Sequence, residues 1–142
     1  MPLKLDLKAG EKMVINGAVL ENVGPNAKIL VHNQAMILRE KEVLTEDICA
    51  TPASRIYLAL QCAYMFPDKK KEYLELAETY LSDFVTACPS SDEIAGKVRE
   101  NIETENLYKG LKGVQELIEY EAQVLEAFSE GIKNIDTVKQ AG

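Results

Sequence analysis

The hydrophobic pattern of this chain changes its period once, near residue 44, and that change limits what the chain can fold into. Before it, apolar and polar residues alternate, as in Leu3–Leu7, which predicts strands with one buried face. After it, apolar residues recur every three or four positions, which predicts amphipathic helices. We therefore expect an α+β fold, with a β-rich part over residues 1–44 and a helical part over residues 45–142.

Turn signals divide the first part into about five short strands. Asn16-Gly17 lies between two apolar runs and indicates a hairpin, because both residues tolerate a positive φ. Gly24-Pro25-Asn26 and Asn33-Gln34 mark further turns. The expected strands lie near residues 3–7, 13–15, 18–20, 29–31 and 36–38. They predict a small antiparallel meander or barrel, with His32 in a strand.

Start signals divide the second part into a bundle of three to four helices. Thr51-Pro52 predicts a helix start, Asp68 is a candidate cap for the next helix, and Ser90–Glu93 is typical of a capping box. The expected helices span residues 52–66, 68–88 and 91–129.

Glycines interrupt the last of these helical stretches. Gly110 and Gly113 predict a kink or break between about residues 103 and 113. We expect the chain to fray from Gly131 onward.

The chain holds few of the side chains that enzymes use. His32 is its single histidine and has no nucleophile motif beside it, and no glycine-rich phosphate loop is present. Cys49, Cys62 and Cys88 lack the spacing of a zinc site or a disulfide framework, so we expect small buried apolar residues. We expect no catalysis, no metal and no cofactor.

The apolar runs are also too short for a membrane helix, which needs roughly 20 apolar residues. The alternating N-terminal residues do not resemble a secretory signal. We therefore expect a cytoplasmic protein without a membrane partner.

Charge is divided unevenly between the two parts. The net charge is −7, but residues 1–44 carry 6 Lys and Arg against 5 Asp and Glu, whereas residues 45–142 carry 10 against 18. The acidity therefore belongs to the helical part, and the β-rich part is the better candidate for binding phosphate.

Five cations in the β-rich part are candidate RNA-binding residues: Lys4, Lys8, Lys12, Arg39 and Lys41. The lysines of the first two strands lie on polar faces, and the last two cations end the last strand. Together they predict a modest basic stripe, the minimum that an RNA-binding surface needs. The alternative for Arg39–Glu42 is a solvated strand end, and for Lys69–Lys71 a solvated helix start.

Several segments resemble the FlbT family, which regulates flagellin synthesis in flagellated bacteria. They are Pro2–Lys12, Ile15–Val19, Leu38–Lys41 and Thr51–Ala53 with Ile56-Tyr57. The resemblance implies a post-transcriptional repressor that associates with the 5′ untranslated region of flagellin mRNA and promotes its degradation. It also implies a functional link to the flagellar protein FlaF.

The layout of residues 1–44 also looks like the carbon storage regulator CsrA, a five-stranded RNA-binding dimer. That resemblance implies RNA contacts from Lys8, before the Gly-Glu turn, and from Arg39 in the Arg-Glu pair. Leu7 stands where that family has a second basic residue.

Two functions stay open at this point. One is a non-catalytic repressor that binds the flagellin mRNA leader through the five cations. The other is a protein-interaction module whose acidic helices bind flagellin, FlaF or another flagellar factor, with an indirect effect on mRNA. We expect a homodimer, because short sheets leave unpaired edges and the apolar stripe after residue 107 exceeds what one subunit can cover.

Overall fold

The computed structural model describes residues 2–45 and 50–141. Its strands are β1 (Leu3–Leu7), β2 (Lys12–Ile15), β3 (Ala18–Glu21), β4 (Ala27–Val31) and β5 (Ile37–Arg39). They form two small antiparallel sheets, one of β1 and β4 and one in the order β3-β2-β5. The predicted α+β class is confirmed, although β2 and β3 are the one consecutive pair of strands that hydrogen-bond, so the connections are not those of a simple meander.

The hairpin between β2 and β3 forms at the predicted turn. Asn16 has φ of 50° and Gly17 of 83°, the left-handed conformation that a tight hairpin turn requires. A side chain at Gly17 would also place its Cβ 3.0 Å from the carbonyl oxygen of Met65. Glycine is therefore needed here for both its conformation and its size.

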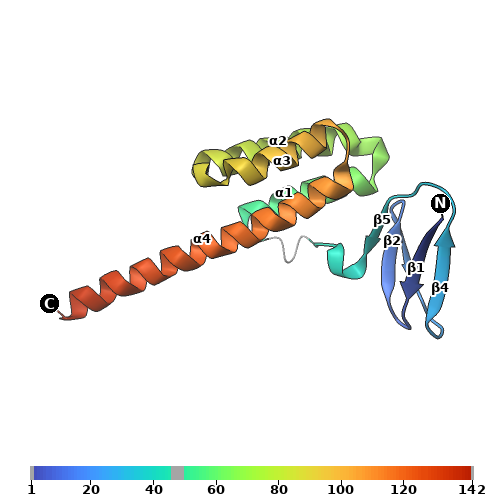
Figure 1. Ribbon diagram of the computed structural model, residues 1–142, viewed down its shortest axis with the longest axis horizontal. Helices are drawn as coiled ribbons and strands as arrows, with labels where there is room; N and C mark the ends of the chain where they lie inside the picture. Colours follow the sequence, from blue (N-terminus) through green and yellow to red (C-terminus); the bar gives the residue numbers. More distant parts are fainter. Residues whose placement is uncertain (1, 46–49, 142) are drawn as a thin grey trace.

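The two faces of the β3-β2-β5 sheet bury different residues. Met13 packs with Leu5 and Leu7 between the two sheets, whereas Val14 and Leu38 join the core of the helical part. Alternation along β2 thus connects two hydrophobic cores, and the sheet of β2 and β5 lies between the β1–β4 sheet and the helices (Figure 1).

The helices are α1 (Pro52–Met65), α2 (Lys70–Ala87), α3 (Asp92–Glu103) and α4 (Leu107–Ala141). Short 3₁₀ turns form at η1 (Glu40–Glu42), η3 (Pro67–Lys69) and η4 (Pro89–Ser91). α1 packs against both α2 and α4, and α3 packs along α4. Helix accounts for 62% of the chain, as the long periodic stretches predicted.

One helix start is as predicted and two differ. Thr51 caps α1, accepting a hydrogen bond from the Ser54 N–H at 3.2 Å. Asp68 does not cap α2, and Ser90 does not cap α3, because its hydroxyl bonds the Tyr120 hydroxyl instead. Both helices follow a proline-initiated 3₁₀ turn, whose own i→i+3 bonds use the N–H groups that a side chain would have capped.

The predicted break is confirmed at residues 104–106, between α3 and α4. Glu105 has a left-handed φ of 59° there. Gly110 and Gly113 lie inside α4 instead. The expected fraying from Gly131 is wrong, because α4 continues to Ala141 (Figure 1). One glycine costs a helix only about 1 kcal/mol, and no proline follows it.

Three smaller predictions also need correction or lie outside the structure. His32 follows β4 rather than lying within a strand. Cys62 and Cys88 are half-buried rather than buried, and Cys49 lies outside the described residues.

Within residues 2–45 and 50–141 there is no helix of the length and hydrophobicity that crossing a bilayer takes, and no cluster of His, Cys, Asp or Glu suited to a metal ion.

Candidate nucleic-acid interface

The outer face of β1 carries the first candidate residues. Leu5 and Leu7 are buried between the sheets, so Lys4 and Asp6 of β1, and Lys8 directly after it, project to the opposite, exposed side. This is the arrangement that strand alternation predicts.

Arg39 ends β5 and reaches across to β1. Its Nη1 donates to the Asp6 carbonyl oxygen at 3.3 Å and to the Glu11 carboxylate at 3.4 Å. The side chain is 34% exposed. Residues 33 positions apart thereby meet at the edge between the two sheets.

A groove of about 540 Å³ lies at this edge. It is lined by Asp6, Lys8, Glu11, Arg39, Glu40 and Lys41. Three of the five predicted cations are therefore brought together, but three carboxylates stand among them. The groove can offer donors to a phosphate or a base edge, and its own carboxylates moderate the positive potential.

A smaller groove of about 340 Å³ continues from the first, because both are lined by Asp6 and Lys8. It adds Lys28, which lies opposite Asp6 in the pairing of β1 with β4. Sequence reasoning missed Lys28 because it placed the start of this strand at residue 29. The signal was present, since Ala27 and Lys28 continue the alternation of the strand.

The β1–β2 turn beside Lys8 is held by the loop before β4. The Asn26 side chain accepts from the Ala9 N–H at 2.9 Å. The Asn22 amide donates to the carbonyls of Leu7 and Pro25 at 3.0 and 2.9 Å. These bonds keep the turn, and with it the Lys8 backbone, in one place.

The remaining cations lie outside both grooves. Lys4 lies on the exposed face of β1, on the same side as Lys8, whereas Lys12 lies on β2 opposite Glu21. In the cluster Lys69–Lys71, Lys70 forms an ion pair with Glu105 at 3.1 Å. The structure therefore does not join all five predicted cations into one stripe.

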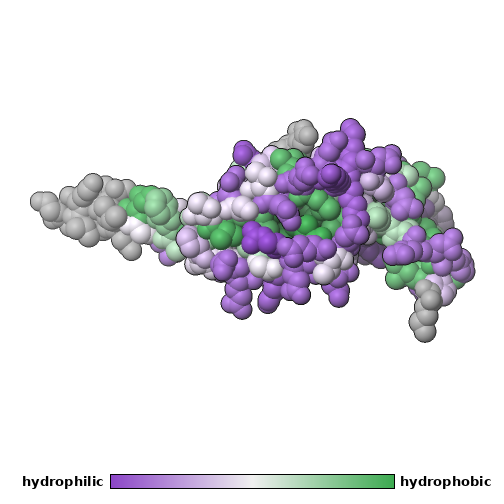
Figure 2. Space-filling view, turned by 90° about the horizontal axis from the view of Figure 1, so that it is seen from above, coloured by the Kyte–Doolittle hydropathy of each residue, from purple (hydrophilic) through white to green (hydrophobic). Residues whose placement is uncertain are grey.

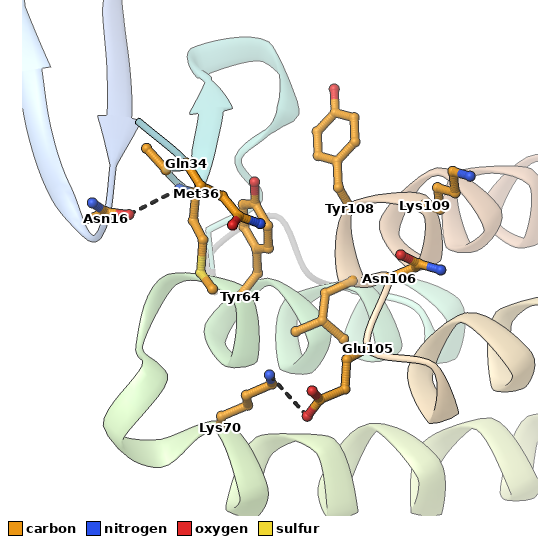
Figure 3. Close-up of a pocket in the computed structure, with 11 residues that line it drawn as sticks. Asn16, Gln34, Met36, Tyr64, Lys70, Glu105, Asn106, Tyr108 and Lys109 are labelled. Atoms are coloured by element: carbon orange, nitrogen blue, oxygen red, sulfur yellow. Dashed lines mark hydrogen bonds and ion pairs between the residues drawn. The ribbon is translucent and has the colours of Figure 1, made fainter. Parts of the chain in front are cut away.

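A separate cleft of about 640 Å³ lies where the β-rich part meets the helices (Figure 3). Asn16, Gln34 and Met36 lie on one side, and Tyr64 and Tyr108 come from α1 and α4. The two tyrosine rings are 6.2 Å apart. Its mixture of amides and aromatic rings comes from segments about 90 residues apart in sequence, so no local pattern could reveal it.

Glu42 joins the candidate interface to the helices. Its buried carboxylate accepts hydrogen bonds from the Tyr108 hydroxyl at 2.7 Å, the Lys112 ammonium at 3.2 Å and the Arg39 N–H at 3.1 Å. Its backbone carbonyl accepts from the Tyr57 hydroxyl at 2.5 Å. The segment that positions Arg39 is thus bonded to both α1 and α4.

Electrostatics at this junction follow from these contacts. Burial by itself raises the pKa of Glu42, but the bonds from Tyr108, Arg39 and Lys112 outweigh it and leave that pKa below its ordinary value. Burial raises the pKa of Tyr108, and the negative charge of Glu42 raises it further. The hydrogen bond to Glu42 raises the pKa of Lys112. The charged form of the Glu42–Lys112 pair is therefore favoured.

Comparison with known proteins identifies the family. The family model described as "Flagellar protein FlbT" matches residues 3–125. "Probable flagellum biosynthesis repressor protein FlbT 1" of Bradyrhizobium diazoefficiens is 36% identical, over 87% of this chain and 85% of that protein. "Flagellum biosynthesis repressor protein FlbT" of Caulobacter vibrioides is 34% identical, over 93% of this chain and 95% of that protein.

No solved structure shows a significant match. The family match covers both parts of the molecule, from β1 to the middle of α4. The chain therefore belongs to the FlbT family of flagellar proteins.

Proposed function

We propose that the chain is a non-catalytic, post-transcriptional repressor of flagellin synthesis. It binds the 5′ untranslated region of flagellin mRNA in the cytoplasm and promotes degradation of the message. Decay follows from altered ribosome access or from a recruited nuclease. The names of the Bradyrhizobium and Caulobacter relatives support repression of flagellum biosynthesis.

One observation supports RNA as the ligand: Arg39 and Lys8, from opposite ends of the β-rich part, line one groove together with Lys41. Arg39 uses Nη1 to bond Asp6 and Glu11. Within the described residues its other guanidinium nitrogens make no hydrogen bond, so they remain available to a phosphate or a guanine edge.

A gel-shift measurement with the purified chain and a flagellin leader RNA tests this proposal. If three phosphates are contacted, log K should fall with log salt with a slope of about −2, because single strands contribute about 0.7 per contact. A scrambled leader of equal length is the control for sequence preference. Absence of any shift at low salt would contradict the proposal.

The charge of the helical part favours a second candidate, a protein-interaction module. Residues 45–142 carry 18 acidic against 10 basic residues, and such a surface repels phosphate. In that case the chain would bind FlaF or flagellin, measurable by titration calorimetry, and would leave the leader RNA unshifted.

A further inference from the structure

The C-terminal part of α4 leaves the bundle and projects away from it (Figure 1). α1 contacts α4 as far as Glu121, whose buried carboxylate accepts from the Ala53 N–H at 2.9 Å. Every residue from Ala122 to Ile132 is exposed. Helices in proteins gain most of their stability from packing an apolar face against a neighbour, so an uncovered apolar face on this part of α4 calls for a partner.

The projecting part has such a face. Leu125, Phe128 and Ile132 are 52%, 66% and 44% exposed. Figure 2 shows the corresponding hydrophobic surface on the projecting helix. Val124, 39% exposed, widens this surface on one side.

These residues continue a seam that already packs inside the molecule. Leu111, Val114, Ile118, Glu121, Leu125, Phe128 and Ile132 follow each other at alternating spacings of three and four. That spacing is the seam of a coiled coil. Leu111 and Val114 are buried against the bundle, so the same stripe passes from an internal interface to an uncovered one.

The borders of the seam carry no charge between residues 122 and 132. Ala122, Ser129 and Gly131 flank it, and a Cβ at Gly131 would meet nothing within 4 Å. Glu119, Glu126 and Glu130 lie on the far side of the helix by its 100° rotation per residue. The uncovered part of the seam, from residue 122 to 132, therefore carries no charge and is complementary to itself, and the acidic residues of two copies would point apart.

We propose that a second copy of this chain covers the seam, with the two α4 helices antiparallel and Phe128 of each copy packed against Ile132 of the other. The antiparallel arrangement is required because each bundle already covers the seam before residue 121. A parallel partner would bring the two bundles to the same end, whereas the antiparallel one places them at opposite ends. This interface is independent of RNA binding, and the family match ends at residue 125, before Phe128.

Light scattering on the full chain tests the interface. The parent should show twice the 15.8 kDa chain mass at micromolar concentration, and Phe128→Glu should show the single-chain mass. Val23→Glu is the matched control, because Val23 is an apolar residue of the β-rich part that is 93% exposed. That variant should remain a dimer.

A monomeric parent at high micromolar concentration overturns the proposal. So does a Phe128→Glu variant that stays dimeric, or a Val23→Glu variant that dissociates, because either result places the interface elsewhere. Phe128 is exposed in the monomer, so the substitution should leave the bundle folded, which near-ultraviolet circular dichroism of the tyrosines verifies.

Orientation is tested by spin labels at Glu119→Cys in a background without Cys49, Cys62 and Cys88. The proposed packing centres on residue 130, so the two labelled positions lie about 33 Å apart along the helices at 1.5 Å per residue. A distance near the helix separation of about 10 Å overturns the antiparallel arrangement.

Discussion

Arg39 and Glu42 lie three residues apart, yet the side chain of Arg39 contacts the β-rich part and that of Glu42 contacts the helical part. The guanidinium of Arg39 reaches β1 at the groove, and the carboxylate of Glu42 reaches Tyr108 and Lys112 on α4. The Arg39 N–H donates to the Glu42 carboxylate and links the two. Substitutions at these positions should therefore separate the proposed RNA binding from stability.

Arg39→Glu should weaken binding of the leader RNA by roughly 1–3 kcal/mol if Arg39 contacts a base, because a bidentate donor is replaced by a like charge to phosphate. Lys8→Glu should mainly weaken binding and reduce its salt dependence, as expected for a lost phosphate contact. Reversal of all three charges in Lys69–Lys71 is the control and should have little effect. If that triple variant alone abolishes a gel shift, the RNA surface lies on the helices.

Glu42→Gln should make stability less sensitive to acid. The pKa of Glu42 in the folded chain lies below its ordinary value of 4.5, so the unfolded chain takes up a proton first as pH falls. The stabilisation is therefore present above about pH 4.5 and is lost as pH falls through the folded-state pKa. Urea unfolding at pH 7 and pH 3 should show a smaller loss for Glu42→Gln than for the parent. Glu40→Gln, in the same turn but exposed, is the control, and an equal loss in the parent and Glu42→Gln would contradict the prediction.

At the scale of elements, glycine sets how closely the helices approach. A Cβ at Gly113 would lie 2.9 Å from Val98 Cγ2, and one at Gly110 would lie 3.1 Å from Leu60 Cδ2. Val98 and Leu60 are fully buried and cannot move aside without disturbing the core. These two glycines therefore permit close contacts of α4 with α3 and α1, while the chain turns at residues 104–106.

Gly113→Ala should lower the free energy of unfolding by about 1–3 kcal/mol, as expected for overpacking a core. Gly96→Ala, at an exposed position of α3, should instead raise it by about 0.5–1 kcal/mol, because nothing lies within 4 Å of the added Cβ and alanine favours helix. Thermal unfolding of the pair measures both effects. A stabilised Gly113→Ala variant would show that α3 and α4 can move apart at little cost.

At the scale of the whole molecule, residues 37–44 are attached to the helices by side chains. Tyr64 accepts from the Ile37 N–H at 3.0 Å, and Gln61 bonds both the N–H and the carbonyl of Leu44 at 2.9 and 2.8 Å. Glu42 adds a hydrogen bond to Tyr108 of α4, and Val14 adds an apolar contact with the core of the helical part. The β-rich part and the helical part therefore share one interface and should lose it together.

We expect a single unfolding transition. Three of the six tyrosines, Tyr57, Tyr64 and Tyr108, lie at this junction. With Tyr73, Tyr80 and Tyr120 replaced by Phe, tyrosine absorbance reports the junction, while far-ultraviolet circular dichroism reports the helices. The two signals should change at the same urea concentration. A tyrosine change that precedes the helical one would show that the two parts separate before either unfolds.

Local patterns in the sequence determined the elements of this protein and several of their ends. Alternation in Leu3–Leu7, the left-handed turn at Asn16-Gly17 and the cap at Thr51 depend on neighbours in the chain, so they can be predicted from residue types alone. The same local rules placed Lys8 on an exposed face and Arg39 at a strand end.

Tertiary structure decided which of these elements meet. The pairing of β1 with β4, which brings in Lys28, and the contact of Arg39 with Asp6 join residues 20 to 33 positions apart. The partners of Glu42 on α4 lie 66 and 70 positions away. Such contacts depend on how whole elements pack, and no periodic pattern in the sequence reveals them. The elements could therefore be predicted from local sequence, whereas the residues that line the candidate site together could be identified only from the tertiary structure.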